Sequence, residues 1–376
     1  MKAVVLAAGY ATRLHPYTEN YPKALLKIAG KPMLDFLMDK LESMPDVDSI
    51  YLVTNSWFFE LFNNWCEGRD SASSLEIIDD GTATNESRLG SIGDLHYTIE
   101  QKEISDDLLV VCSDKMFTFS LAELVRCFKS RGEVVNAVSD IGDKRRVKGL
   151  YGCVILGPEN RILEYREKPQ KPKSSLRSVT FYVYPKKTIP LIAEYARGAT
   201  RADAPGYFSE WLSRRAPMYA WFMNGECYDA GNPQSYAAVQ RKFGTGPVDV
   251  KVLLLPPGPS GQGVLADIEF VIEGLSRWAA VSLVYVGVRE SWLAGYGRWV
   301  GDHPSPLPIC IRKSETRGHA NSAENMALIK KTGCTVVVSL DSHIRDFQFD
   351  PERLNELVGQ GNLLKIEKGL ISPLAG

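Results

Sequence analysis

The chain has 376 residues, of which 44% are hydrophobic and 24% are charged, and this composition excludes a disordered protein. Its 44 basic and 45 acidic residues give a formal charge of -1, so no overall basic field favours nucleic acid, and any anion site is local. No apolar run approaches the roughly 18 residues of a membrane span, and the N-terminus enters an apolar run directly without a signal peptide. We therefore expect a cytoplasmic protein, and the length favours two domains.

The first 34 residues indicate a phosphate-binding loop. An apolar run at residues 3–6 ends in Ala-Ala-Gly, which closes at Gly9. A buried strand that ends where a ligand approaches bare backbone has this pattern. Arg13 and Lys23 follow on either side of a turn-rich segment, and two cations beside exposed backbone N–H groups suit a polyphosphate.

Beyond this loop, strand-like and helical patterns alternate. Helices are predicted at 33–44 and between 94 and 107, and strands at 49–54, 75–78 and 107–114. Alternation of this kind predicts a Rossmann-like, mostly parallel sheet with flanking helices, which binds ligands at the carboxyl ends of its strands. Residues 6–9, the loop 79–90 and Asp114 all fall at such ends.

The rest of the chain continues the α/β pattern and contains one linker-like segment. Strands are predicted at 134–140, 149–156, 161–166, 178–184 and 218–223, and helices from 121, at 189–196, at 205–215 and from about 233. The segment 244–249 is rich in glycine and proline, as linkers often are. After it, strands are predicted at 250–255, 281–288, 308–312 and 335–340, with helices at 264–278, 290–300 and 321–331. The expected domains are 1–243 and a second, smaller α/β domain at 250–376.

Four ordered motifs in the first part resemble those of the sugar-phosphate nucleotidyltransferases, which join an NTP to a sugar 1-phosphate and release pyrophosphate. They are LAAGYATRL with PKALL and GKP (residues 6–32), Asp114 in CSDKMF, the tripeptide Glu167-Lys168-Pro169, and CYDAGNPQSY (residues 227–236). Ala11 stands where many members have glycine. In the last motif, Cys227, Ala230 and Asn232 replace the tryptophan, isoleucine and threonine of the family. The resemblance covers residues 1 to about 243 and nothing beyond.

The resemblance implies a role for each matching residue. In nucleotidyl transfer, a phosphate oxygen attacks the α-phosphorus in line with the departing pyrophosphate, so catalysis consists of positioning and charge neutralisation. By resemblance, Arg13 binds the leaving phosphates, Lys23 the transferred phosphate and Lys168 the phosphate of the acceptor. Backbone around the nucleotide is supplied by Leu6, Ala7, Ala8 and Gly9. Asp114 and Asp229 are the implied ligands of Mg²⁺, which takes one or two carboxylates together with phosphate oxygens.

The base and the acceptor are harder to predict. The loop 81–94 occupies the place where the family contacts the base, and the Asn85 amide could offer both a donor and an acceptor to a pyrimidine edge. Gly90 could let the base approach the backbone. Alternatively, Asn85 and Glu86 satisfy the amides of their own loop. A pyrimidine NTP is only mildly preferred, and the acceptor is a sugar 1-phosphate or a similar phosphorylated molecule.

The second part has no recognised family and leaves alternatives open. It shows no hexapeptide period, although members of the family often carry a β-helix of such repeats. Asp341 and His343 follow a predicted strand, but no metal-ligand spacing supports a second catalytic site. The alternatives are a bifunctional enzyme whose second domain acts on the same metabolite, and a nucleotide-sugar-binding regulator without turnover. The expected partners are the NTP and its acceptor, with no nucleic acid and no membrane, and homo-oligomerisation is left open.

Overall fold

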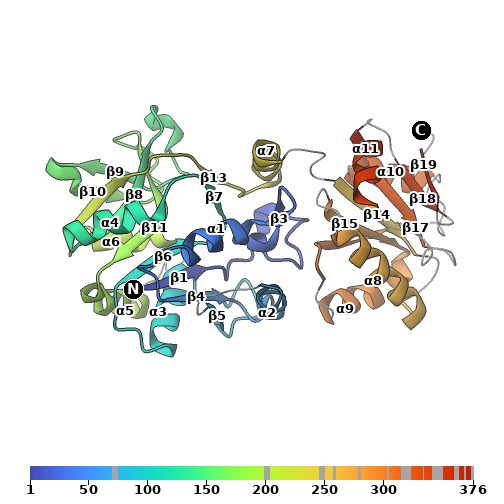
Figure 1. Cartoon of the computed structure of the whole chain (residues 1–376), viewed down its shortest axis with the longest axis horizontal. Helices are drawn as coiled ribbons and strands as arrows, with labels where there is room; N and C mark the ends of the chain where they lie inside the picture. Colours follow the sequence, from blue (N-terminus) through green and yellow to red (C-terminus); the bar gives the residue numbers. More distant parts are fainter. Residues whose placement is uncertain are drawn as a thin grey trace. The chain divides into compact units, whose positions relative to one another are not determined.

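A computed structural model of the chain is shown in Figure 1. It describes residues 1–69, 75–198, 204–244, 250–256, 260–277, 281–302, 305–314, 323–332, 334–340, 350–359, 364–367 and 370–373. The chain divides into two compact units, which do not follow the order of the sequence. The first contains residues 1–9 and 34–228, and the second contains residues 10–33 and 229–376. The domain boundary at 243–250 stays a prediction.

The first unit is built on a nine-stranded sheet. Its strands are β1 (Lys2–Leu6), β4 (Ser49–Thr54), β5 (Leu75–Asp79), β6 (Leu108–Cys112), β8 (Val134–Asp140), β9 (Cys153–Leu156), β10 (Ile162–Arg166), β11 (Leu176–Tyr184) and β12 (Met218–Phe222). The order β10-β9-β11-β6-β1-β4-β5 forms the main path, and β8 pairs with both β11 and β12. The short strands β7 (Lys115–Phe117) and β13 (Cys227–Asp229) lie outside this sheet.

The parallel part of the sheet brings several strand ends to one edge. Strand β1 runs parallel to both β4 and β6, so that Leu6 lies opposite Val53 on one side and Cys112 on the other. Strand β5 continues the parallel set, with Ile78 opposite Val53. The ends of β1, β5 and β6 therefore share one edge, as predicted. The rest of the sheet is more mixed than predicted, because β11 runs antiparallel to β6, β8 and β9.

Amphipathic helices cover this sheet. The first unit contains α1 (Met33–Glu42), α2 (Phe59–Glu67), α3 (Ser91–Gln101), α4 (Leu121–Arg131), α5 (Ile189–Gly198) and α6 (Pro205–Leu212). In α4 the buried residues Leu121, Leu124, Val125 and Phe128 form one apolar stripe at helical spacing. This helix ends at Gly132, whose left-handed backbone (φ 65°) is the conformation that glycine adopts without steric cost.

The second unit carries a parallel sheet in the order β16-β15-β14-β17-β18, which β19 extends in the antiparallel direction. The strands are β14 (Val250–Leu255), β15 (Val281–Val288), β16 (Ile309–Lys313), β17 (Val336–Ser339), β18 (Leu364–Glu367) and β19 (Leu370–Pro373). The helices are α7 (Pro233–Phe243), α8 (Gln262–Ser276), α9 (Leu293–Asp302), α10 (Ala323–Thr332) and α11 (Pro351–Gly359). All eight residues of β15 are buried, as expected for a central parallel strand with both faces covered.

The predicted α/β class, with a second, smaller sheet after the first, is confirmed. The strands predicted at 250–255 and 281–288 match β14 and β15 residue for residue, whereas α11, β18 and β19 were not predicted. Asp341 and His343 lie outside the described residues. Within the described part of the chain, no helix is long and apolar enough to cross a membrane. All seven cysteines are free thiols.

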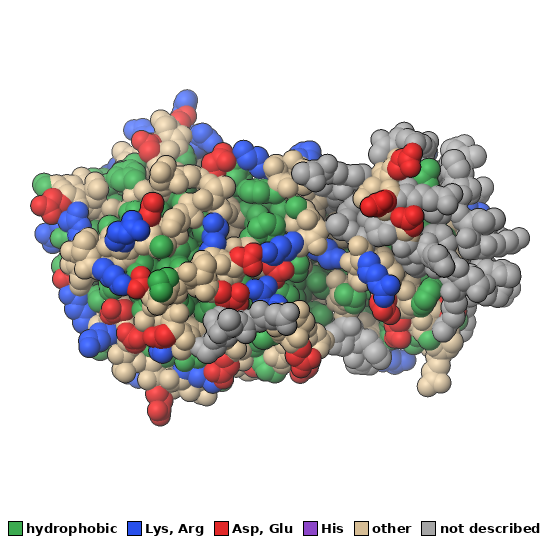
Figure 2. All heavy atoms as spheres, in the orientation of Figure 1, with side chains coloured by type: hydrophobic (Ala, Val, Ile, Leu, Met, Phe, Trp, Pro, Cys, Tyr) green, Lys and Arg blue, Asp and Glu red, His purple; other side chains and the backbone are tan. Residues whose placement is uncertain are grey.

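Surface charges of both signs are mixed on the first unit. On the face shown in Figure 2, lysine and arginine side chains alternate with aspartate and glutamate over this unit, and no continuous basic field forms there. This mixing agrees with the formal charge of -1. An anion site on this unit therefore depends on a few local cations.

The segment 10–33, which belongs to the second unit, is a series of short elements. It contains the 3₁₀ turns at Thr12–Leu14 and Lys23–Leu25 and the two-residue strands β2 (Lys27–Ile28) and β3 (Lys31–Pro32). Helix α7 holds it through Lys27, whose carbonyl accepts hydrogen bonds from Tyr236 Oη at 2.8 Å and from Gln240 Nε2 at 3.1 Å. The edge of the Tyr236 ring also packs on Tyr17, with 5.2 Å between the centroids.

The buried amine of Lys27 makes the stability of this unit depend on pH. Its Nζ donates to the Ser276 carbonyl at 2.6 Å, and burial lowers the pKa of the amine from 10.5 to about 8. Between these two values the unfolded chain binds more protons than the folded chain, so the free energy of unfolding rises with pH.

We expect this rise to be about 1 kcal/mol smaller between pH 8 and 9.5 in Lys27→Met than in the wild type. Urea unfolding followed by circular dichroism at the two pH values measures it. The exposed Lys171→Met is the control, and a rise in Lys27→Met equal to that of the wild type would contradict the prediction.

Candidate functional site

The predicted nucleotide loop begins where β1 ends between two neighbouring strands. The Leu6 carbonyl accepts hydrogen bonds from Ser113 N at 3.1 Å and from Ser113 Oγ at 2.9 Å. The Ala8 carbonyl accepts one at 2.9 Å from the side chain of Asn55, which is fully buried. These bonds hold the backbone from Leu6 to Ala8 on both sides. The next residue, Gly9, is exposed.

The space around Gly9 is open. A Cβ atom added to this glycine would meet no other atom within 4 Å, and Gly9 is not among the glycines with positive φ. Neither packing nor backbone conformation in the described chain therefore requires glycine here. A glycine here leaves the backbone open to the close approach of a ligand, and the role of Gly9 towards a nucleotide stays a prediction.

Asp114 lies at the same sheet edge as this loop. It follows β6 by two residues, and the last residue of β6, Cys112, is opposite Leu6. Its side chain is 31% exposed, and the Lys115 ammonium lies 3.3 Å from its Oδ1. The structure thus brings the predicted metal ligand Asp114 and the predicted nucleotide loop together within the first unit.

The loop predicted to contact the base also begins at this edge, after β5. Gly81 and Gly90 have positive φ angles of 79° and 76°, so both positions favour glycine for conformational reasons. Reciprocal hydrogen bonds between Thr84 and Ser87 hold the turn between them. Asn85 contributes its backbone carbonyl, which accepts a hydrogen bond from Arg88. The roles of Asn85 and Gly90 towards a base stay predictions.

In the second unit, Lys23 and Asp229 form an ion pair. Lys23 Nζ donates to Asp229 Oδ1 at 3.1 Å, and the exposed fractions of the two side chains are 10% and 39%. The structure thus brings together the predicted ligand of the transferred phosphate and a predicted metal ligand, which are 206 residues apart in the sequence. Arg13 is exposed, and no hydrogen bond or ion pair engages its guanidinium within the part of the chain that the structure describes.

The residues after Asp229 leave room for its carboxylate and begin helix α7. A Cβ atom added to Gly231 would lie 3.2 and 3.3 Å from the two carboxylate oxygens of Asp229, which is closer than ordinary contact. Asn232 then caps helix α7, because its Oδ1 accepts from Ser235 N at 2.9 Å while Ser235 Oγ accepts from Asn232 N at 3.1 Å. Asparagine caps helices as well as threonine does, so this departure from the family motif keeps the local structure.

The backbone conformation of Ala11 indicates the free-energy cost of alanine where many members of the family have glycine. Ala11 has left-handed backbone angles (φ 48°, ψ 39°), and its carbonyl accepts a hydrogen bond from Thr18 Oγ1 at 2.9 Å. Glycine adopts this conformation freely, whereas the Cβ atom of any other residue raises its free energy by roughly 1–2 kcal/mol. The glycine that many members of the family have at this position would be unstrained in this turn, whereas Ala11 adopts it at some cost.

Lys168 occupies another left-handed position, with φ 46°. Its N–H donates to the Tyr151 carbonyl at 3.2 Å, and its side chain is 45% exposed with Nζ 3.8 Å from Glu167 Oε1. Positive φ is uncommon for residues other than glycine and often marks a functional position. This conformation fits the predicted role of Lys168 without testing it.

Sequence reasoning did not select Glu167, which has a distinctive environment. Its side chain is 8% exposed, and burial raises the pKa of its carboxyl while the Lys168 ammonium opposes the shift. A Cβ atom at Gly206 would lie 1.8 Å from its carboxylate, so this glycine makes room for it. A Cβ atom at Gly152 would lie 2.3 Å from Tyr165 Oη and 3.0 Å from the Glu167 carboxylate, so Gly152 makes room for both side chains. The Glu-Lys-Pro motif contains Glu167, but Gly152 and Gly206, which lie next to its carboxylate in the fold, are elsewhere in the sequence.

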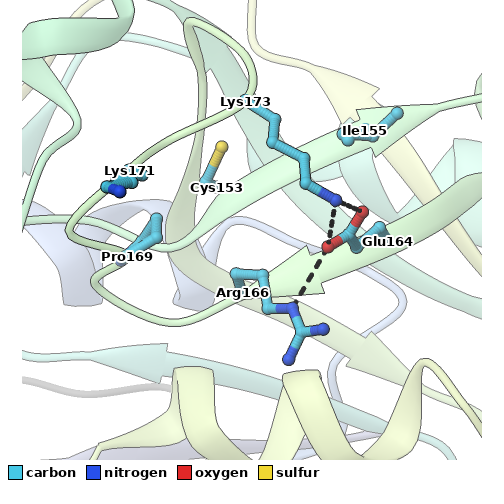
Figure 3. Close-up of a pocket in the computed structure, with 7 residues that line it drawn as sticks. All are labelled: Cys153, Ile155, Glu164, Arg166, Pro169, Lys171 and Lys173. Carbon is cyan, nitrogen blue, oxygen red and sulfur yellow. Dashed lines mark hydrogen bonds and ion pairs between the residues drawn. The ribbon is translucent and has the colours of Figure 1, made fainter.

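A cavity of about 230 Å³ lies against the antiparallel strands β9 and β10, lined by Cys153, Ile155, Glu164, Arg166, Pro169, Lys171 and Lys173 (Figure 3). Glu164 and Arg166 project from β10 to the side opposite the buried Tyr165, because side chains alternate along a strand. Glu164 accepts from Lys173 Nζ at 2.7 Å and from Arg166 Nε at 3.1 Å, so these cations already have a counter-charge. Lys168 does not line this cavity, which is therefore not the predicted phosphate site.

Comparison with known proteins identifies the family. The sequence pattern of the nucleotidyl transferase family matches residues 2–245, and the chain belongs to this family. The resemblance predicted from the four motifs is thereby confirmed.

The relatives show what this chain is similar to. A provisionally named mannose-1-phosphate guanyltransferase of Sulfolobus acidocaldarius is 32% identical over 190 residues, which are 50% of each chain. The bifunctional protein GlmU of Methanocaldococcus jannaschii is 31% identical over 192 residues, 51% of this chain and 42% of that protein. The matched region thus spans about half or less of these relatives. The crystal structure of UDP-glucose pyrophosphorylase with UDP-glucose has the same fold, with a TM-score of 0.54 and 18% identity over 64% of this chain and 97% of that one.

Proposed function

We propose that the chain transfers a nucleotidyl group from an NTP to a sugar 1-phosphate or a similar phosphorylated acceptor. A phosphate oxygen of the acceptor forms a bond to the α-phosphorus, the bond from that phosphorus to the bridging oxygen breaks, and pyrophosphate leaves with the electron pair. The observation that carries the proposal is the family match over residues 2–245. The relative named as a guanyltransferase supports the class of reaction, the base stays open, and our mild preference is a pyrimidine.

The proposed roles follow the four motifs. The backbone of Leu6, Ala7, Ala8 and Gly9 borders the nucleotide, and the open space at Gly9 supports close approach. Arg13 neutralises the leaving phosphates, and its exposed guanidinium supports this role. Lys23 contacts the transferred phosphate and Lys168 the acceptor phosphate, while Asn85 and Gly90 face the base.

We further propose that Asp114 and Asp229 hold Mg²⁺. Both carboxylates are partly exposed and offer the hard oxygen donors that this ion prefers, so the residues fit it. The ion would supply charge neutralisation for the phosphates. Lys115 Nζ lies 3.3 Å from the Asp114 carboxylate, and Lys23 Nζ lies 3.1 Å from the Asp229 carboxylate. We propose that the reaction takes place in the cytoplasm, and homo-oligomerisation stays open.

The test is pyrophosphate release from a matrix of the four NTPs against phosphorylated acceptors, with Mg²⁺ present and with the ion removed by a chelator. We expect Mg²⁺-dependent release with at least one NTP and one sugar 1-phosphate. Nucleotide binding without release across the whole matrix would overturn the proposal in favour of a regulator that has lost turnover.

A further inference from the structure

Glu19 links the predicted phosphate-binding segment to the edge strand of the second sheet. Arg312 on β16 donates to both oxygens of this carboxylate, from Nη2 to Oε1 at 2.9 Å and from Nη1 to Oε2 at 3.2 Å. The Cys310 thiol donates to the same Oε2 at 3.1 Å. Cys310 and Arg312 are two residues apart on β16 and so point to the same side of the strand. One carboxylate therefore receives three hydrogen bonds from one strand.

The environment of this contact strengthens it beyond an ordinary surface pair. The side chains of Arg312 and Glu19 are only 33% and 34% exposed, and bidentate arginine–carboxylate pairs are geometrically specific. Burial alone would raise the pKa of Glu19, but the hydrogen bonds from Arg312 and Cys310 outweigh burial and lower it. Burial and the Glu19 carboxylate raise the pKa of the Cys310 thiol, which therefore stays protonated as a donor.

Further contacts hold the same segment to the same part of the chain. Tyr21 Oη donates to the Pro306 carbonyl at 3.3 Å, and Lys251 Nζ lies 5.6 Å from the centroid of the Tyr17 ring. Tyr17 and Tyr21 are 2% and 6% exposed, so these are packed contacts rather than surface ones. Together with Glu19 they lie between Arg13 and Lys23 in the sequence.

Arg312 lies outside the region that the family shares, which ends at residue 245. The chain beyond this region is therefore in direct contact with a segment that contains two of the proposed phosphate ligands, Arg13 and Lys23. We propose that Arg312 is a positioning residue: through Glu19 it fixes the segment 10–33 in the conformation that binds the nucleotide phosphates. This inference rests on the proposed nucleotidyl transfer. The C-terminal sheet then contributes to nucleotidyl transfer itself and not to a separate activity.

The test uses the full chain with Arg312→Gln, which keeps much of the side chain but removes the charge and the bidentate geometry. We expect the KM for the NTP to rise about fivefold, with the KM for the acceptor unchanged, because one half-buried ion pair contributes about 1 kcal/mol. Arg312→Lys should recover part of the loss. Arg277→Gln removes the exposed pair with Glu273 in the same unit and should change neither constant.

Hydrogen exchange separates failure of this inference from failure of the proposed function, because it needs no turnover. Amides within the segment, such as those of Leu14, Tyr17, Leu25 and Leu26, donate to carbonyls three residues earlier. They should exchange severalfold faster in Arg312→Gln than in the wild type or in Arg277→Gln. Glu19→Gln should give the same increase, and the double variant no more than either alone. Unchanged exchange in both single variants would overturn the inference, even if the enzyme is active.

Discussion

Replacement of Asp229 by asparagine is expected to lower turnover at least about a hundredfold while the fold is kept. The side-chain Oδ1 of asparagine can still accept the hydrogen bond from Lys23, which preserves the local geometry at 3.1 Å. The negative charge that would hold Mg²⁺ is lost, and charge neutralisation is the main contribution to phosphoryl-type transfer. Because the wild-type carboxylate is 39% exposed, the loss of the ion pair itself should cost about 1 kcal/mol or less of stability.

The measurement is pyrophosphate release as a function of Mg²⁺ concentration, together with a thermal unfolding curve. Glu273→Gln is the matched control, since it removes an exposed carboxylate of the same unit that pairs with Arg277 at 3.0 Å. It should keep full activity. Full activity of Asp229→Asn at the same Mg²⁺ concentration would disprove the assignment of Asp229 as a metal ligand.

Replacement of Gly9 by valine should abolish nucleotide binding with little effect on stability. An added Cβ atom meets no other atom within 4 Å, so we expect the folded chain to tolerate a small side chain at this position. A nucleotide that approaches the backbone of Gly9 could not tolerate it, and steric exclusion should lower kcat/KM for the NTP about a hundredfold or more. Gly9→Ala should give an intermediate loss.

The control is Gly297→Ala in α9, where an added Cβ also meets nothing within 4 Å. It should leave kcat/KM unchanged and raise the free energy of unfolding by about 0.5–1 kcal/mol, because alanine is favoured over glycine inside a helix. Direct titration with a fluorescent NTP separates lost binding from lost chemistry. If Gly9→Val binds the NTP as the wild type does, the loop after β1 is not the nucleotide site.

Sequence reasoning succeeded where the signal is local. The end of β1 was predicted from an apolar run followed by small residues, and α7 was predicted from a proline in its first turn, which the structure places at Pro233. The family follows from motifs whose residues are close in sequence. Glu167 was missed because its burial depends on Gly152 and Gly206, which contact it only in the folded chain.

The partners of the segment 10–33 could not be predicted for the same reason. The segment 10–33 follows β1 directly, so its sequence suggests that it belongs with the first sheet. Its contacts with Asp229, Ser276 and Arg312 place it instead with the second unit. Nothing in the composition of the segment indicates these partners, because each is a single residue more than 200 positions away.

The distance in sequence between Glu19 and Arg312 has a consequence for synthesis of the protein. The two residues are separated by 293 positions, and Lys23 and Asp229 by 206. At a translation rate of about 5–20 residues per second, the ribosome needs roughly 15–60 s to add the later partner of Glu19. During that time the segment 10–33, although made early, lacks the contact between Glu19 and Arg312. The segment 10–33 can thus complete its final set of contacts only after β16 has been made.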